Sequence, residues 1–215
     1  RPQELAGMAR FGLTGAGRLG LSVPAMRSVA RELGRDHGLA QALWDTGIPD
    51  ARIVAAYLAE PARFTVRQMD AWAAGCMAWD VCDQVCSNAF RHSPLAWARV
   101  PVWARRKGTF VRRAAFSLLA ALAVHDRHAD DARFIEALEW VEAAADDDRN
   151  FVKKAVNWAL RAIGKRNAHV HAHALATALR IRAQGTPAAR WIAADALREL
   201  EGPAVSARLA RRGAS

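Results

Sequence analysis

The chain has 215 residues, of which 52% are hydrophobic and 24% are charged, and its formal net charge is +10 at pH 7. This length can build one sizeable core or one elongated repeat array, and no apolar run approaches the roughly 20 residues that a membrane span requires. Lys and Arg outnumber Asp and Glu by 31 to 21. The excess favours a partner rich in negative charge, nucleic acid first, although an Arg-rich composition from a high-GC genome is the alternative.

Helices are predicted almost throughout, because apolar residues recur at helical spacing, alanine is abundant and β-branched runs are missing. Turn signals separate about a dozen helices; they lie at residues 20–24, 46–50, 60–65, 92–94, 106–109, 145–150, 163–167, 184–187 and 201–203. First-turn prolines and N-caps mark several starts. These are Pro24, Thr65, Pro94, Thr109, Pro187 and Pro203.

A sequence repeat is visible in the second half of the chain. The segment FVRRAAFSLLAAL at 110–122 aligns with FVKKAVNWALRAI at 151–163, 41 residues later, and AARWIAADALREL at 188–200 is a weaker third copy. A period of about 40 residues with two helices per unit is the signature of HEAT-like repeats. We therefore expect one all-α domain over residues 1–215: an α-solenoid of antiparallel helix pairs, curved around a basic concave groove.

The segment MAWDVCDQVCSNAF at 77–90 places an indole and a carboxylate one helical turn apart. On a helix, Trp79 and Asp83 lie about 40° apart at the edge of an apolar stripe, while Asp80 and Ser87 fall on the solvent side. A Trp and an acid would then emerge together where the helix passes from buried to open. Such an edge is where a cleft is expected.

The repeat helices add two further candidates. In 110–122 the stripe runs through apolar residues such as Val111 and Leu118, and Arg113 points nearly opposite to it. In 151–163 Trp158 lies beside Lys154 and Arg161. An indole next to cations suits a surface that holds sugar and phosphate, although a lone Trp is more often a core residue.

Other chemistry is not expected. The sequence has no Gly-rich phosphate loop, no nucleophile elbow and no zinc signature. His169, His171 and His173 alternate, so a helix would spread them over different faces, and no metal or cofactor is predicted. Three cysteines, Cys76, Cys82 and Cys86, are an odd number. They favour reduced, packed thiols in a cytoplasm, and the start RPQELAGMARFG lacks the apolar core of a signal peptide.

Taken together, several segments resemble the AlkD-like DNA alkylation repair enzymes, which are HEAT-repeat DNA glycosylases. The resemblance covers nearly the whole chain; its segments are 10–48, 51–58, WDVCDQVC at 79–86, FVRRAAF at 110–116, FVKKAVNWALRAIGKRN at 151–167 and ARWIAADALREL at 189–200. It implies catalytic roles for Trp79, Asp83, Arg113 and Trp158, and all four residue types of the family's active site are present.

The resemblance also implies a substrate: duplex DNA carrying N3- or N7-alkylated purines, processed without base flipping. The cationic base is already a good leaving group. Asp83 would stabilise the oxocarbenium-like sugar and orient water, the two indoles would face the sugar, and Arg113 would hold a phosphate. Basic residues of the inner helices are candidates for further phosphate contacts; these are Arg112, Lys153, Lys154 and Arg161.

Two alternatives remain at this point. One is a non-catalytic HEAT-repeat module that binds damaged or branched DNA, which would not require Asp83. The other is a HEAT scaffold for proteins, which the strong basic bias disfavours. For the glycosylase we expect a monomer without an obligatory protein partner, cytoplasmic in a bacterium and nucleoid-associated when on DNA. The preferred lesion, whether 3-methyladenine, 7-methylguanine or a bulky adduct, stays open.

Overall fold

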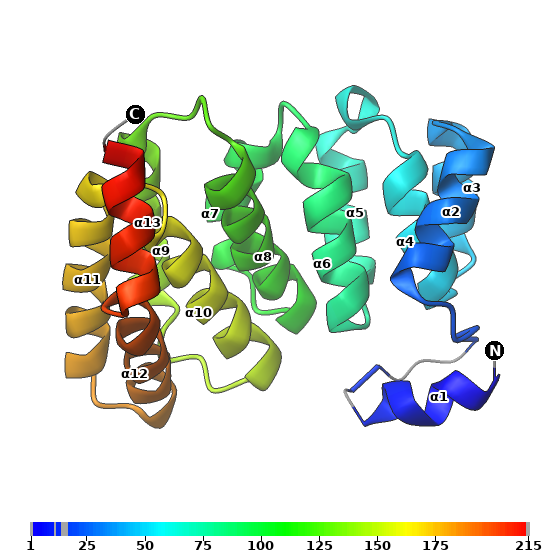
Figure 1. Cartoon of the computed structure of the whole chain (residues 1–215). Helices are drawn as coiled ribbons and strands as arrows, with labels where there is room; N and C mark the ends of the chain where they lie inside the picture. Colours follow the sequence, from blue (N-terminus) through cyan, green and yellow to red (C-terminus); the bar gives the residue numbers. More distant parts are fainter. Residues whose placement is uncertain (1, 11, 14–16, 214–215) are drawn as a thin grey trace. The chain divides into compact units, whose positions relative to one another are not determined.

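The computed structural model describes residues 2–10, 12–13 and 17–213, and all regular structure within them is helical (Figure 1). The chain divides into two compact units, residues 1–98 and 99–215, each with its own buried core. The predicted all-α class is confirmed, whereas a single domain over residues 1–215 stays a prediction. In the described part of the chain, no helix combines the length and apolar character needed to cross a membrane.

The first unit contains α1 (Pro2–Ala9), α2 (Val23–Leu33), α3 (His37–Asp45), α4 (Pro49–Leu58), α5 (Val66–Gly75) and α6 (Trp79–Asn88), with 3-10 turns at Pro61–Arg63 and Phe90–His92. Helix α4 packs against α2, α3 and α6. The core is largely aromatic: the rings of Trp44 and Trp72 stack with centroids 4.2 Å apart, and Phe64 meets Trp72 edge-on at 5.1 Å. The central position of α4 therefore fixes where α2 and α6 present their outer faces.

The second unit contains α8 (Thr109–His125), α9 (Asp131–Ala143), α10 (Asn150–Gly164), α11 (Ala168–Ala183), α12 (Pro187–Leu200) and α13 (Pro203–Gly213); α7 (Ala96–Ala104) includes the point where the units divide. The three copies of the predicted repeat fall in α8, α10 and α12. Helix α10 packs against α8 on one side and α12 on the other. The repeat is therefore confirmed as helices that lie side by side.

Small residues allow these helices to approach closely. Ala155, Ala159 and Ala162 of α10 are buried. At Gly164 an added Cβ would lie 2.8 Å from Cδ2 of the buried Leu200 on α12, closer than carbon atoms pack without displacement. The contact between α10 and α12 therefore depends on a residue without a side chain.

Most predicted helix starts are confirmed. Thr65 caps α5 in a full capping box with Gln68, and Pro187 and Pro203 open α12 and α13. Pro24 lies in the first turn of α2 behind the N-cap Ser22. Two predictions are wrong. Pro94 lies in a turn before α7, and Thr109 is the first helical residue after the N-cap Gly108, its hydroxyl accepting a hydrogen bond from Arg149 at 3.2 Å.

Residues 18–21, just before α2, are held by two carboxylates. The buried Asp50 on α4 accepts hydrogen bonds from the backbone N–H groups of Leu19 and Leu21, both at 2.9 Å. Arg18 forms a two-pronged ion pair with Asp80 of α6, at 2.8 and 3.0 Å, and its side chain is 3% exposed. Residues 18–21 are therefore bound to both α4 and α6, although they form no helix themselves.

Replacing Asp50 by Ala should destabilise the first unit, because two backbone donors lose their acceptor and a buried unsatisfied polar group costs about 1–3 kcal/mol. We expect Asp50→Ala to lower the free energy of unfolding by about 2–4 kcal/mol in urea titrations followed by circular dichroism. Asp45→Ala, at an exposed position on α3, should change it by about 0.5 kcal/mol or less. Equal losses in the two variants would contradict the role given to Asp50.

Candidate catalytic residues and nucleic-acid interface

Trp79 and Asp83 occupy the first two turns of α6. The helix begins after Ala78, which has extended backbone angles and offers no side-chain cap. Trp79 is the first helical residue and Asp83 follows one turn later; both side chains are half-buried. The indole and the carboxylate therefore lie at the border of the buried face of α6, where the helical spacing predicts them.

Three cysteines are buried at α6 and in the turn just before it. Cys76, Cys82 and Cys86 are free and buried, as predicted, and the Cys76 thiol donates to the Trp72 carbonyl at 3.3 Å. The hydrogen bond with Cys82, together with burial, raises the pKa of Cys76 well above its usual value. Burial and the same partner raise the pKa of Cys86. The negative charge of Asp83 adds to both effects, so the thiols near this carboxylate stay protonated.

The second acid of α6 is not on the solvent side, and the prediction for Asp80 is wrong. Its side chain is 12% exposed and is paired with Arg18. The reason is that residues 18–21 cover this part of the first turn, which the helical angles of α6 alone do not reveal. Asp80 and Asp83 therefore have different surroundings although they are three residues apart.

Arg113 does not point away from the core either, so that prediction is also wrong. The residue is 5% exposed, and its Nη1 donates to the backbone carbonyl oxygen of Phe151 at 2.7 Å. Every residue of α8 from 113 to 123 is buried, because α10 covers the side that a solvent-facing helix would leave open. This hydrogen bond ties α8 to the first turn of α10 and fixes the guanidinium.

Trp158 is half-buried on α10 rather than fully enclosed in the core, and Lys154, one turn earlier, is exposed. Lys154 makes no ion pair within the described residues. Trp158 and Lys154 are therefore one helical turn apart, a half-buried indole and an exposed cation that no acid pairs, and their role in binding sugar and phosphate stays a prediction.

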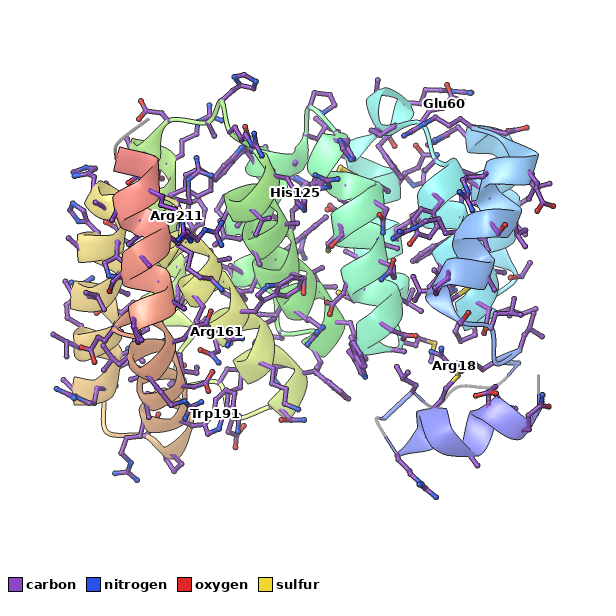
Figure 2. The ribbon with its side chains drawn as sticks, viewed as in Figure 1. Arg18, Glu60, His125, Arg161, Trp191 and Arg211 are labelled. Carbon is purple, nitrogen blue, oxygen red and sulfur yellow. The ribbon has the colours of Figure 1, made fainter. Side chains whose placement is uncertain are left out.

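Three contacts at matching levels connect α10 to α12, and we call them the α10–α12 ladder. They are Lys153–Trp191, Asn157–Asp195 and Arg161–Glu199, each with partners 38 residues apart. The Lys153 ammonium lies 5.0 Å from the Trp191 ring centroid. Asn157 donates to Asp195 at 2.6 Å, and Arg161 donates to Glu199 at 2.5 Å. Figure 2 shows Arg161 and Trp191 on these two neighbouring helices.

The ladder changes the interpretation of Arg161. Its guanidinium also lies 3.5 Å from Asp195, and Lys165 pairs with Glu199 as well. Burial alone would raise the pKa of Glu199, but the hydrogen bonds and charges of Lys165 and Arg161 outweigh it and lower that pKa. The Glu199 carboxylate therefore stays ionised and neutralises part of the positive charge that the sequence assigns to this face.

Arg112 is similarly engaged. Its Nη1 lies 2.8 Å from the carboxylate of Asp147, which also accepts from Arg149 at 2.6 Å. The Asp147 side chain is only 4% exposed. Burial would raise its pKa, yet the side-chain and backbone hydrogen bonds from Arg149 and the charges of Arg149 and Arg112 hold it below the usual value.

The four residues predicted to be catalytic are divided between the two units. Trp79 and Asp83 belong to residues 1–98, and Arg113 and Trp158 belong to residues 99–215. Their action in one site stays a prediction.

The histidines need one correction. On α11, His169 and His173 are both exposed and their ring centroids are 5.1 Å apart, so these two share a face. His171 instead contacts the Gly164 carbonyl through Nδ1 at 2.7 Å. Among the described residues, no group of three or more His, Cys, Asp or Glu side chains could hold a metal ion.

One group of cations is missed by sequence reasoning. Arg27, Arg31 and Arg35 follow one another at intervals of four residues, which is the signal that could have revealed them. All three are exposed, and none makes an ion pair within the residues that the structure covers.

Comparisons with known proteins agree with this fold. A solved structure matches with a TM-score of 0.75 and 20% identity, over 84% of this chain and 77% of that chain; it is described as a new family of proteins related to the HEAT-like repeat DNA glycosylases, with affinity for branched DNA structures. This likeness establishes a HEAT-like helical repeat protein. No curated protein matches. The family model "DNA alkylation repair enzyme" matches residues 1–200, and the chain therefore belongs to the DNA alkylation repair enzyme family.

Lys154 and Arg161 should contribute differently to DNA binding. Each phosphate contact made by a cation makes the slope of log K against log salt concentration more negative by about 0.9, because counterions are released from the DNA. A cation that is already paired with acids of the protein should contribute less to this slope. We expect Lys154→Gln to reduce the slope by about that amount and Arg161→Gln to reduce it clearly less, measured by fluorescence anisotropy with a labelled duplex. A larger change in Arg161→Gln would show that the ladder opens to bind phosphate.

The Asp147 carboxylate should stabilise the fold in a pH-dependent way. Because its folded pKa is lowered, its contribution is fully present above the usual carboxyl pKa and is lost as the pH falls through the lowered value. The stability difference between the parent and Asp147→Asn should be constant above about pH 5 and should narrow below about pH 4. Urea titrations across this range test it, and a difference that stays constant into strong acid would contradict it.

Proposed function

We propose that this protein is a DNA glycosylase that hydrolyses the N-glycosidic bond of cationic N3- or N7-alkylated purines in duplex DNA. The main support is the half-buried pair of Trp79 and Asp83 on α6 in a chain that belongs to the DNA alkylation repair enzyme family. A carboxylate on a DNA-binding surface weakens phosphate binding. Its presence there is best explained by a chemical task.

Asp83 is proposed to act on the sugar. An N3- or N7-alkylated purine carries a positive charge and leaves as a neutral base, so no strong general acid is required. As the C1′–N bond breaks, positive charge develops on the deoxyribose, and the ionised carboxylate stabilises it. The same carboxylate orients the water whose oxygen then bonds to C1′. The thiols of Cys76 and Cys86 stay neutral, so they add no second negative charge beside this carboxylate.

The indoles and the cations are proposed to bind the sugar and the backbone. A π face offered to a developing cation is worth about 0.5–2 kcal/mol, which suits the half-buried Trp79 and Trp158. Arg113, whose guanidinium is fixed by the Phe151 carbonyl, is proposed to hold a phosphate of the same DNA. Lys154 is the best placed of the other predicted contacts, since Arg112 and Arg161 are paired with acids.

The proposal includes that the protein acts on the lesion from the DNA backbone and leaves the damaged base stacked in the duplex, without base flipping. Its consequence is that no pocket has to enclose the base, so bulky N3- and N7-adducts should be released as well as methylated bases. Complete rejection of bulky adducts would contradict it.

A second candidate function is the recognition of branched DNA without base excision. It is favoured by the structural neighbour, whose family is described as having affinity for branched DNA. The two functions differ in one residue: binding alone does not require a carboxylate at Asp83. They also differ in substrate, since a branch binder should prefer a three-way junction to a duplex of equal length.

The first test is release of the base from a duplex with a single 7-methylguanine. We expect the parent to release it and Asp83→Asn to lose about 100-fold or more in the single-turnover rate, as is usual when a preorganised electrostatic group is removed. DNA affinity should be kept or increased in Asp83→Asn, because a negative charge near phosphates has gone.

Asp80→Asn is the matched control, since it makes the same chemical change three residues away. Asp80 is paired with Arg18, so this variant should lower the melting temperature while keeping most of the rate in the folded protein. No release by the parent from 7-methylguanine, 3-methyladenine and bulky-adduct duplexes, together with salt-sensitive junction binding, would favour the second candidate.

A further inference from the structure

An open pocket of about 230 Å³ lies between α2 and α4 in the first unit. Its lining residues are Arg27, Ala30, Arg31, Gly34, Arg35 and Tyr57, and we call it the arginine pocket. Arg27 and Arg31 are one turn apart on α2, and Arg35 follows just after the helix ends. Three guanidinium groups therefore surround a hollow with one aromatic wall.

The positive charge of the arginine pocket is not balanced by the protein. Within the described residues, Arg27, Arg31 and Arg35 form no ion pair. This differs from the second unit, where Arg112 and Arg161 both contact carboxylates. Residues 1–98 contain ten Arg and no Lys against nine Asp and Glu, so the net charge of the first unit is small. The three pocket arginines are therefore a local positive cluster that an anion could reach.

The pocket is ordered by a chain of hydrogen bonds that leads to α6. Arg27 lies over the Tyr57 ring, 5.5 Å from its centroid, and its Nη2 donates to the Tyr57 hydroxyl at 3.4 Å. That hydroxyl donates to the Gln84 side chain at 2.7 Å, and Asn88 donates to the same oxygen at 3.0 Å. Gln84 and Asn88 belong to α6, so these hydrogen bonds connect the pocket to the helix that also carries Asp83, although Gln84 and Asp83 point about 100° apart around it.

A purely structural role explains only part of this cluster. Arg31 lies in the last turn of α2, and Arg35 donates to the carbonyl of Ala59, the C-cap of α4, at 2.9 Å. Both positions favour cations, because helix C-termini carry a partial negative charge of about half a unit. Arg27 lies near the middle of α2, outside this field. Its structural contacts are those with Tyr57, and they are opposed by the charge of Arg31, because like charges one turn apart destabilise a helix by roughly 0.2–0.5 kcal/mol.

We propose that the arginine pocket binds phosphodiester groups of the DNA backbone and gives the first unit a phosphate contact of its own, beside the sugar contacts proposed for Trp79 and Asp83. Guanidinium groups present planar donor pairs that match phosphate oxygens, and the exposed Arg27 and Arg31 can each supply one. The inference rests on DNA as the partner, which both candidate functions share, and does not depend on base excision. It adds a phosphate site on α2 to the predicted phosphate contacts, which all lie in the second unit.

The test is the salt dependence of binding to an undamaged duplex by fluorescence anisotropy, with the parent and Arg27→Gln/Arg31→Gln. Loss of two phosphate contacts should reduce the slope of log K against log salt by about 1.8. The matched control is Arg10→Gln/Arg67→Gln, which removes two exposed arginines of the first unit that, like Arg27 and Arg31, form no ion pair within the described residues. It should change the slope by less than half as much, and melting curves establish that each variant is folded.

The outcomes separate this inference from the proposed function. If the parent binds DNA with a steep salt dependence and the pocket variant shows the same slope, the phosphate site in the arginine pocket is overturned, while DNA as the partner is not. Equal reductions of the slope in the pocket and control variants would also overturn the phosphate site, because the total positive charge of the protein would then explain the salt dependence. Absence of salt-sensitive binding by the parent would overturn DNA as the partner, and the pocket inference with it. A selective loss in the pocket variant supports the inference even if no base is released from any alkylated duplex.

Discussion

Close packing between helices through small residues is the constraint on which the second unit depends. Alanines line the buried side of α10, and at Gly164 a methyl group would collide with Leu200 of α12. Protein interiors are packed at crystal-like density, so a helix cannot move outward by part of an ångström without losing contacts along its length. The separation and register of α8, α10 and α12 are therefore set from the buried side, before any surface residue contributes.

This register decides which surface residues meet. Once α10 and α12 lie side by side at a fixed level, side chains 38 residues apart face one another, and the acids of α12 reach the cations of α10. A net charge of +10 therefore describes the interface poorly. Several cations are balanced locally by Asp147, Asp195 and Glu199. The excess of Lys and Arg over Asp and Glu still supplies long-range attraction to a polyanion, whereas direct phosphate contacts are left to the cations that no acid pairs.

The sequence predicts what is local and periodic, and it fails where a distant segment covers a surface. Helical spacing identifies the repeat, the buried thiols and the border position of Trp79 and Asp83, since these follow from the geometry of one helix. It misplaces Asp80 and Arg113, because the residues that cover them, Arg18 and Phe151, are 62 and 38 residues away. Pairing of Arg161 with Glu199 is hidden for the same reason: charge counts do not show which charges are neighbours.

The attachment of residues 18–21 has a consequence for the dynamics of the first unit. Their amides are held by a side chain of α4 rather than by a helix, so this segment can open in a local event that leaves the core intact. In such an opening Arg18 leaves Asp80, and the first turn of α6 gains an uncompensated negative charge next to Trp79. The attachment of residues 18–21 thus decides whether the charge of Asp80 at the start of α6 is neutralised by Arg18. The rate of amide hydrogen exchange at Leu19 and Leu21 reports how often this segment opens.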